Sequence, residues 1–143
     1  MAKKNWEKAE IGIARAINGK RTPGSGNGFL EGDISTKNML VEVKETSRPF
    51  LTFRLSWLKK IIEEANRAKK IPVFGIEFFD KTQKFLVRVK DLESYTQLSI
   101  LDLTNNLTVS FRGEFLEDNT LLRTIYGDWL VVDIDVIKTI SCY

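Results

Sequence analysis

Three charged residues stand close together among apolar neighbours in the first third of the chain. Asp33 precedes an isoleucine, and Glu42 and Lys44 follow nine and eleven residues later, each next to a valine. In an extended segment, alternation puts Glu42 and Lys44 on one face. That pair alone is typical of the solvent-facing side of a strand. Asp33 favours another interpretation, because a turn over residues 35–38 folds it back beside Glu42 and makes a pair of carboxylates with a cation adjacent.

Such a pair predicts a metal site. Two carboxylates held side by side repel each other, and one takes up a proton unless a cation compensates. The chain has no histidine and a single cysteine, Cys142, so oxygen atoms are the expected metal ligands. Mg²⁺ is the predicted ion, and Mn²⁺ can substitute, with positions left for a phosphate oxygen and an attacking water. The predicted chemistry is phosphodiester hydrolysis, with Lys44 stabilising charge on the phosphoryl oxygens or orienting the water.

The distribution of charge is consistent with a polyanionic partner. Residues 1–70 carry 15 Lys and Arg against 8 Asp and Glu, a net charge of +7, whereas residues 71–143 carry 7 against 11, a net charge of −4. Clustered cations gain affinity for phosphates by releasing counterions. A solvated, lysine-rich surface explains the charge equally well.

Length and hydropathy predict one domain over residues 1–143, since 43% of the residues are apolar, enough for a core at this size. No apolar run approaches the ~18 residues of a membrane span, and the beginning of the chain is polar. We therefore expect no membrane association and a cytoplasmic, intracellular location. A virus-encoded protein acting in the host cytoplasm is one such case.

The elements that must position the charged residues follow from periodicity. Helical spacing predicts helices over residues 5–18 and 55–65, and short extended runs predict strands over 32–35, 39–44, 71–79 and 84–89. Residues 91–101 fit either a helix or a strand, while 107–115 and 128–137 alternate like strands. The predicted fold class is α/β: a mixed central β-sheet flanked by helices, with an additional β-rich C-terminal part.

The residues that carry the predicted chemistry also resemble a known family. Asp33 and the Glu42-Val43-Lys44 run, entered from a short apolar strand, resemble the PD-(D/E)xK nuclease superfamily. The glutamate-bearing first helix, the Arg21-Thr22-Pro23-Gly24-Ser25-Gly26 loop and the Gly32-Asp33-Ile34 run look like archaeal and phage-type Holliday junction resolvases. The resemblance covers residues 5–80. It implies a restriction-endonuclease-like nuclease core over about residues 5–90, followed by a part over 91–143 that extends the sheet or serves dimerisation.

The resemblance also implies residue roles. Family members supply a glutamate from the first helix as a further metal ligand or support, and Glu10 lies nearer the apolar stripe of that helix than Glu7 does. We therefore expect Glu10, Asp33, Glu42 and Lys44 to be catalytic, with Glu10, Asp33 and Glu42 at the metal. Lys20, Arg21 and Ser25 are expected to contact the DNA backbone, although the glycine-rich loop alone fits a flexible connector.

Three functions stay open at this point. The first is a Mg²⁺-dependent endonuclease that resolves DNA four-way (Holliday) junctions. The second is the same chemistry on duplex or branched replication intermediates, and the third is a DNA-binding relative without catalysis. The first also predicts a homodimer, because symmetric resolution of a junction needs two active sites.

Overall fold

The computed structural model describes residues 4–22 and 33–143. Its helices and strands, in chain order, are α1 (Asn5–Ile17), β1 (Lys20–Arg21), β2 (Ile34–Ser35), β3 (Met39–Glu45), β4 (Phe50–Arg54), α2 (Ser56–Ala68), β5 (Ile71–Glu77), β6 (Gln83–Arg88), the 3₁₀ turn η1 (Val89–Asp91), β7 (Ser99–Asp102), β8 (Thr108–Arg112), β9 (Thr120–Thr124), β10 (Gly127–Val132) and α3 (Ile134–Ser141). None of the helices within the described ranges is long and apolar enough to cross a membrane.

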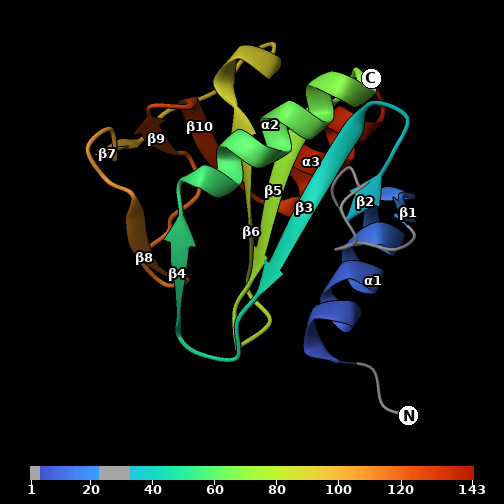
Figure 1. Ribbon diagram of the computed structural model, residues 1–143, viewed down its shortest axis with the longest axis horizontal. Coiled ribbons are helices and arrows are strands. Elements are labelled where there is room, and N and C mark those ends of the chain that lie inside the picture. The colour runs from blue at the N-terminus through green and yellow to red at the C-terminus, as the bar shows by residue number, and fades with distance from the viewer. Residues whose placement is uncertain (1–3, 23–32) are drawn as a thin grey trace.

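One large mixed sheet organises the described part of the chain. Its strand order is β1-β2-β3-β5-β6-β10-β9-β7, and β4 pairs with β8 in a separate two-stranded sheet. The pairs β3–β5 and β7–β9 are parallel, and the others are antiparallel. The predicted α/β class is confirmed: helices flank a mixed sheet (Figure 1). Residues beyond 91 continue the same sheet, because β10 pairs with β6.

Each face of the sheet has its own apolar core. On one face α2 and the β4–β8 pair pack over side chains such as Leu40, Phe74 and Trp129. On the other face α1 and α3 pack over Met39, Val41 and other strand residues. Strand β3 thus contributes Leu40 to the first core and Met39, Val41 and Val43 to the second. By the same alternation, the side chains of its other two even-numbered residues, 42 and 44, face the α2 side.

Both predicted helices are confirmed. Helix α1 ends at Asn18, whose left-handed backbone (φ 54°) lets its N–H reach the carbonyls of Ala14 and Arg15. Helix α2 ends in the same way at Lys69 (φ 57°). The strands predicted over 39–44, 71–79 and 84–89 correspond to β3, β5 and β6. Strand β2 begins at Ile34, and Gly32 lies outside the described residues.

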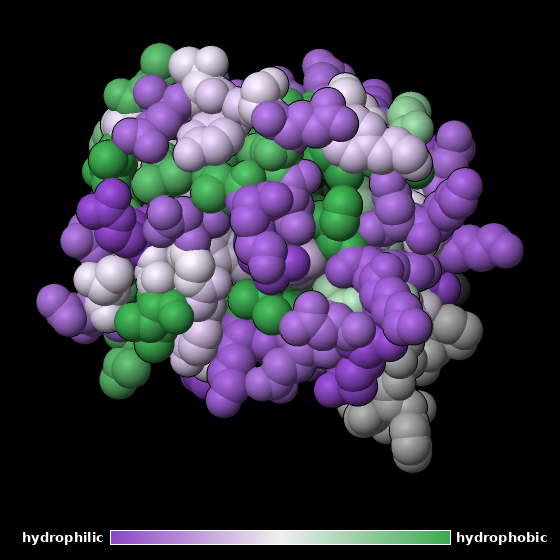
Figure 2. All heavy atoms as spheres, turned by 90° about the horizontal axis from the view of Figure 1, so that it is seen from above, coloured by the Kyte–Doolittle hydropathy of each residue, from purple (hydrophilic) through white to green (hydrophobic). Residues whose placement is uncertain are grey.

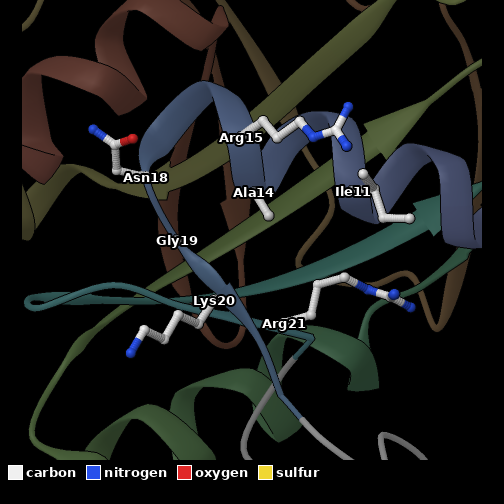
Figure 3. Close-up of a pocket in the computed structure, with 7 residues that line it drawn as sticks. All are labelled: Ile11, Ala14, Arg15, Asn18, Gly19, Lys20 and Arg21. Carbon is white, nitrogen blue, oxygen red and sulfur yellow. The ribbon is translucent and has the colours of Figure 1, made fainter.

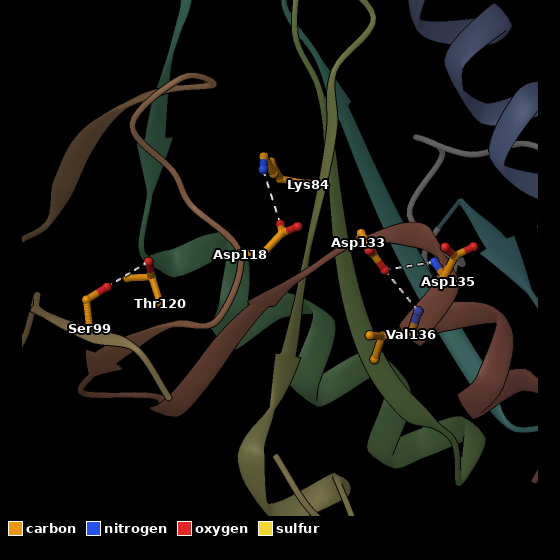
Figure 4. Close-up of polar contacts among 7 residues, drawn as sticks. All are labelled: Lys84, Ser99, Asp118, Thr120, Asp133, Asp135 and Val136. Atoms are coloured by element: carbon orange, nitrogen blue, oxygen red, sulfur yellow. Dashed lines mark hydrogen bonds and ion pairs between the residues drawn. The ribbon is translucent and has the colours of Figure 1, made fainter. Parts of the chain in front are cut away.

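The prediction of one strand over residues 128–137 was wrong. Strand β10 ends at Val132, and Asp133 is the N-cap of α3: its Oδ1 accepts hydrogen bonds from the N–H groups of Asp135 (3.0 Å) and Val136 (3.2 Å) (Figure 4). Alternating apolar residues favoured a strand, but a capping aspartate satisfies the exposed N–H groups of a helix start and stabilises the turn to helix. Asp133 and Asp135 therefore belong to the start of a helix.

The rest of the C-terminal part consists of short elements. Residues 91–101 contain the end of η1 and the start of β7, and the strand predicted over 107–115 is the shorter β8. Polar contacts fasten this part: Lys84 on β6 pairs with Asp118 (3.1 Å), and the Ser99 and Thr120 hydroxyls lie 3.0 Å apart (Figure 4). Seen from above, apolar side chains reach the surface mainly on the β7–β9 side, whereas the α1 side is mostly hydrophilic (Figure 2).

Candidate functional site

The turn between β2 and β3 fixes the position of Asp33. Thr36 Oγ1 accepts from the N–H of Met39 (2.9 Å), and the Thr36 N–H donates to the Met39 carbonyl (3.0 Å). Asn38 anchors the turn to α3 through Ile140 O (2.7 Å) and to β5 through the Ile71 N–H (2.8 Å). A threonine and an asparagine suit such a turn because their side chains bond nearby backbone groups. The turn sets the register that pairs Ile34 with Val41.

That register places Asp33 across from Glu42. The Asp33 N–H donates to the Val41 carbonyl (2.9 Å), and Asp33 Oδ2 accepts from the Val43 N–H (2.8 Å). Asp33 is thus held against β3 on both sides of Glu42. The predicted juxtaposition of the two carboxyl groups is present in the structure, and it arises from the hairpin as the sequence indicated.

Burial and mutual repulsion act on this pair. Desolvation, and after it the charge of Asp33, raise the pKa of Glu42 to about 7, against the lowering effect of Lys60 and Lys44. Desolvation also raises the pKa of Asp33, although the hydrogen bond from Val43 N–H and the charge of Lys44 lower it. Two neighbouring carboxyls that resist ionisation together are the electrostatic condition that a bound cation relieves.

Lys44 lies next to the pair and is held by an aromatic ring. Its Nζ is 3.9 Å from Glu42 Oε1 and 4.9 Å from the centroid of the Trp57 ring, so a cation–π contact orients it. The Trp57 ring stacks on Phe74 (centroids 5.9 Å apart, interplanar angle 7°) and meets Phe53 edge-on (5.2 Å). Trp57 thus packs against the apolar core on the α2 side and also contacts Lys44.

Helix α2 brings two further charged residues that the sequence did not single out for this place. Glu64 is buried (4% exposed), and the Lys60 Nζ lies 3.8 Å from its Oε1. The charges of both act on Asp33 and on Glu42, Lys60 lowering and Glu64 raising their pKa values. The available signal was a glutamate three residues after Ile61 on the apolar face of the helix, where a charged residue is rarely placed without a partner.

Glu10, on the α1 side of the sheet, interacts with one member of the pair, Asp33. It is buried (4% exposed) on α1, and its Oε1 accepts from Arg21 Nε at 3.2 Å. Desolvation raises the pKa of Glu10, and the charge of Asp33 raises it further, while Arg21 lowers it. The structure thus places Glu10 near Asp33, with Arg21 as its direct partner. Glu7, the alternative on this helix, is half-buried.

The predicted DNA contacts are only partly described. Lys20 and Arg21 form β1, the edge strand, and both are exposed, while Ser25 lies outside the described residues. A surface hollow of about 550 Å³ lies between β1 and α1, lined by Ile11, Ala14, Arg15, Asn18, Gly19, Lys20 and Arg21 (Figure 3). The side chains of Arg15 and Arg21 extend to the same side with Ile11 between them, whereas Lys20 turns the other way (Figure 3).

The donor atoms fit a hard divalent cation. Asp33 and Glu42 offer carboxylate oxygens, and Mg²⁺ is commonly bound by one or two carboxylates with water completing its coordination. Within residues 4–22 and 33–143, no group of three or more acidic or cysteine side chains forms a ready-made metal cage. A two-carboxylate site with Glu10 nearby is therefore the arrangement that the chain offers to such an ion.

Comparisons with known proteins name no family for this chain. No protein-family model matches it, and no curated protein is similar to it at a significant level. The function must therefore be inferred from the fold and from the geometry around Asp33 and Glu42.

Proposed function

We propose that this protein is a Mg²⁺-dependent endodeoxyribonuclease of the PD-(D/E)xK type, and that it resolves DNA four-way junctions. The observation that carries the proposal is the adjacent pair Asp33 and Glu42, both with raised pKa and with Lys44 Nζ 3.9 Å from Glu42. A core made of a mixed sheet between helices, with the acidic pair on β2–β3, supports the resemblance to restriction-endonuclease-like nucleases.

The carboxylates and the lysine have distinct tasks in this proposal. Asp33 and Glu42 would hold Mg²⁺, with Glu10 supporting from α1, and Mn²⁺ would substitute. When bound, the ion would polarise a phosphoryl oxygen and lower the pKa of a water molecule. Lys44 stabilises negative charge that develops on the phosphoryl oxygens, or orients the attacking water. Trp57 helps to hold the Lys44 ammonium beside Glu42, while 36% of the lysine side chain stays exposed.

The substrate assignment is supported by the basic side of the molecule. Arg21 has its Nε committed to Glu10, so the terminal nitrogens of its guanidinium remain for a phosphate. Lys20 lies on the same strand, and Ser25, outside the described residues, completes the proposed DNA contacts. Contacts to phosphates carry no direct information about base sequence, and so they suit recognition of the shape of branched DNA. A homodimer follows from this proposal, since two sites cut a junction symmetrically.

Cleavage of a labelled four-way junction tests the proposal. Wild type, Asp33→Asn and the surface variant Glu63→Gln are compared on junction and on matched linear duplex, with Mg²⁺ or with EDTA. We expect paired nicks in the junction that EDTA and Asp33→Asn abolish and Glu63→Gln leaves unchanged. Metal-dependent cutting of both substrates would refute selectivity for junctions and leave a nuclease that acts on other DNA. Binding without any cutting would leave a non-catalytic DNA-binding protein.

A further inference from the structure

The outward face of α1, together with its N-cap Lys4, carries exposed cations. Lys4, Lys8 and Arg15 are exposed along it, and none of the three has an ion-pair partner among the described residues. No acidic residue stands three or four positions from Lys8 or Arg15, the spacing at which helix side chains pair. The acidic residues of α1, Glu7 and Glu10, are half-buried and buried.

Gly12 interrupts this face in a way that the fold does not require. Glycine weakens a helix interior relative to alanine. A Cβ added at Gly12 would meet no atom within 4 Å, so packing among the described residues gives no reason for its absence. Missing side chains suit positions where another backbone approaches closely. We call the exposed face formed by Lys4, Lys8, Gly12 and Arg15 the basic stripe.

The basic stripe is linked to the proposed active site through Arg21. Arg15 and Arg21 line the same hollow, and their side chains extend to the same side (Figure 3). Arg21 in turn binds Glu10, whose carboxyl lies close enough to Asp33 for their charges to interact. Arg21 is paired with Glu10 through its Nε, and the terminal nitrogens of both guanidinium groups can donate to a phosphate bound in the hollow. Lys8 lies about 10 Å from Arg15 along the helix axis, toward the N-terminus of α1.

We propose that the basic stripe binds the sugar-phosphate backbone of the DNA beyond the phosphate that is cleaved, with Arg15 and Arg21 sharing one phosphate and Lys8 contacting another. The contact is independent of base sequence, because cations on a helix face that meet only phosphates carry no information about bases. This inference rests on the proposed function, since it takes DNA as the partner.

The salt dependence of binding tests the proposal without relying on cleavage. Binding of a labelled four-way junction is followed by fluorescence anisotropy in EDTA over a range of NaCl concentrations. The variant Lys8→Gln/Arg15→Gln is compared with wild type and with Lys90→Gln/Arg123→Gln, which removes the same charge from exposed positions on η1 and β9. Each lost phosphate contact reduces the slope of log K against log [salt] by about 0.9. We expect a reduction of about 0.9 for the stripe variant, since Arg21 still neutralises the phosphate that it shares with Arg15, and none for the control.

Each other outcome overturns a different statement. Equal losses in both double variants would mean that net charge, not the basic stripe, sets the affinity. An unchanged slope in the stripe variant, with normal junction binding, would refute the stripe and leave the nuclease proposal standing. A wild-type protein that binds no DNA at low salt would refute the nuclease proposal as well. Stripe-dependent binding to vesicles containing phosphatidylserine, with none to DNA, would assign the face to a membrane surface.

Discussion

Replacing Glu42 by glutamine is expected to stabilise the metal-free protein at neutral and alkaline pH. Burial and the Asp33 charge raise the pKa of Glu42 from 4.5 to about 7. A carboxyl whose pKa is higher in the folded than in the unfolded state binds more protons when folded. The contribution of this carboxyl to the free energy of unfolding therefore falls as the pH rises from about 4.5 to about 7, and it stays at its lowest value above pH 7.

The size of the effect follows from the shift. One pKa unit corresponds to about 1.4 kcal/mol, so a shift of this size destabilises the folded, metal-free protein by about 3 kcal/mol above pH 7. Glutamine has nearly the same volume and no charge, and Glu42→Gln removes this term. The free energies of unfolding of the variant and the wild type should therefore differ little through this effect at pH 4. By pH 8 the free energy of unfolding of the variant should have risen by about 3 kcal/mol relative to that of the wild type.

Urea unfolding in EDTA, followed by circular dichroism at pH 4 to 8, measures this difference. Glu63→Gln is the matched control, because Glu63 is an exposed carboxylate on α2 whose ion pair with Lys59 spans 4.0 Å, and surface pairs of this kind contribute little. A difference between Glu42→Gln and wild type that stays constant with pH would refute the reasoning. So would a loss of stability in Glu42→Gln that grows toward pH 8.

Three further outcomes are expected. Gly12→Ala should raise the free energy of unfolding by about 1 kcal/mol in urea titrations, because the new Cβ meets no atom within 4 Å; a destabilised variant would show that the helix interior is crowded there. Asp133→Ala should lower the free energy of unfolding by about 1 kcal/mol through loss of the α3 N-cap, and Asp135→Ala should lower it by less. Equal losses in the two variants would refute the cap assignment. Trp57→Leu should lower kcat for DNA cleavage about five- to tenfold with little change in KM, since a cation–π contact with Lys44 contributes about 1 kcal/mol. Trp57→Phe should retain most of the activity. Equal losses of kcat in the two variants would mean that packing alone matters.

The candidate site could be predicted from the sequence where it depends on local structure. A short turn and the two-residue period of strands are enough to bring Asp33 beside Glu42 and to put Lys44 on the same face. The register Ile34↔Val41 has this consequence. The two helices were predictable for the same reason, since their apolar stripes and left-handed ends at Asn18 and Lys69 are local features.

The prediction failed where two local patterns competed. Alternating apolar residues after Asp128 favoured a strand through Ile137, but Asp133 begins a helix. The apolar residues of α3, such as Ile137 and Ile140, pack against the α1 face of the sheet. Tertiary burial thus selects helix over strand in a segment that fits both, because either conformation presents an apolar surface but only one meets the available core.

The acidic pair, its lysine and the order of the main helices and strands were predictable from the amino-acid sequence, because neighbours within a hairpin or a helix are set by chain geometry. Which distant residues join them depends on how the folded chain packs: Trp57, Lys60 and Glu64 come from α2 on one face of the sheet, and Glu10 with Arg21 lies on the other. The two helices cover opposite faces because their apolar stripes pack on the two sides of β3. Charges far apart in sequence interact there because burial removes the water that would screen them.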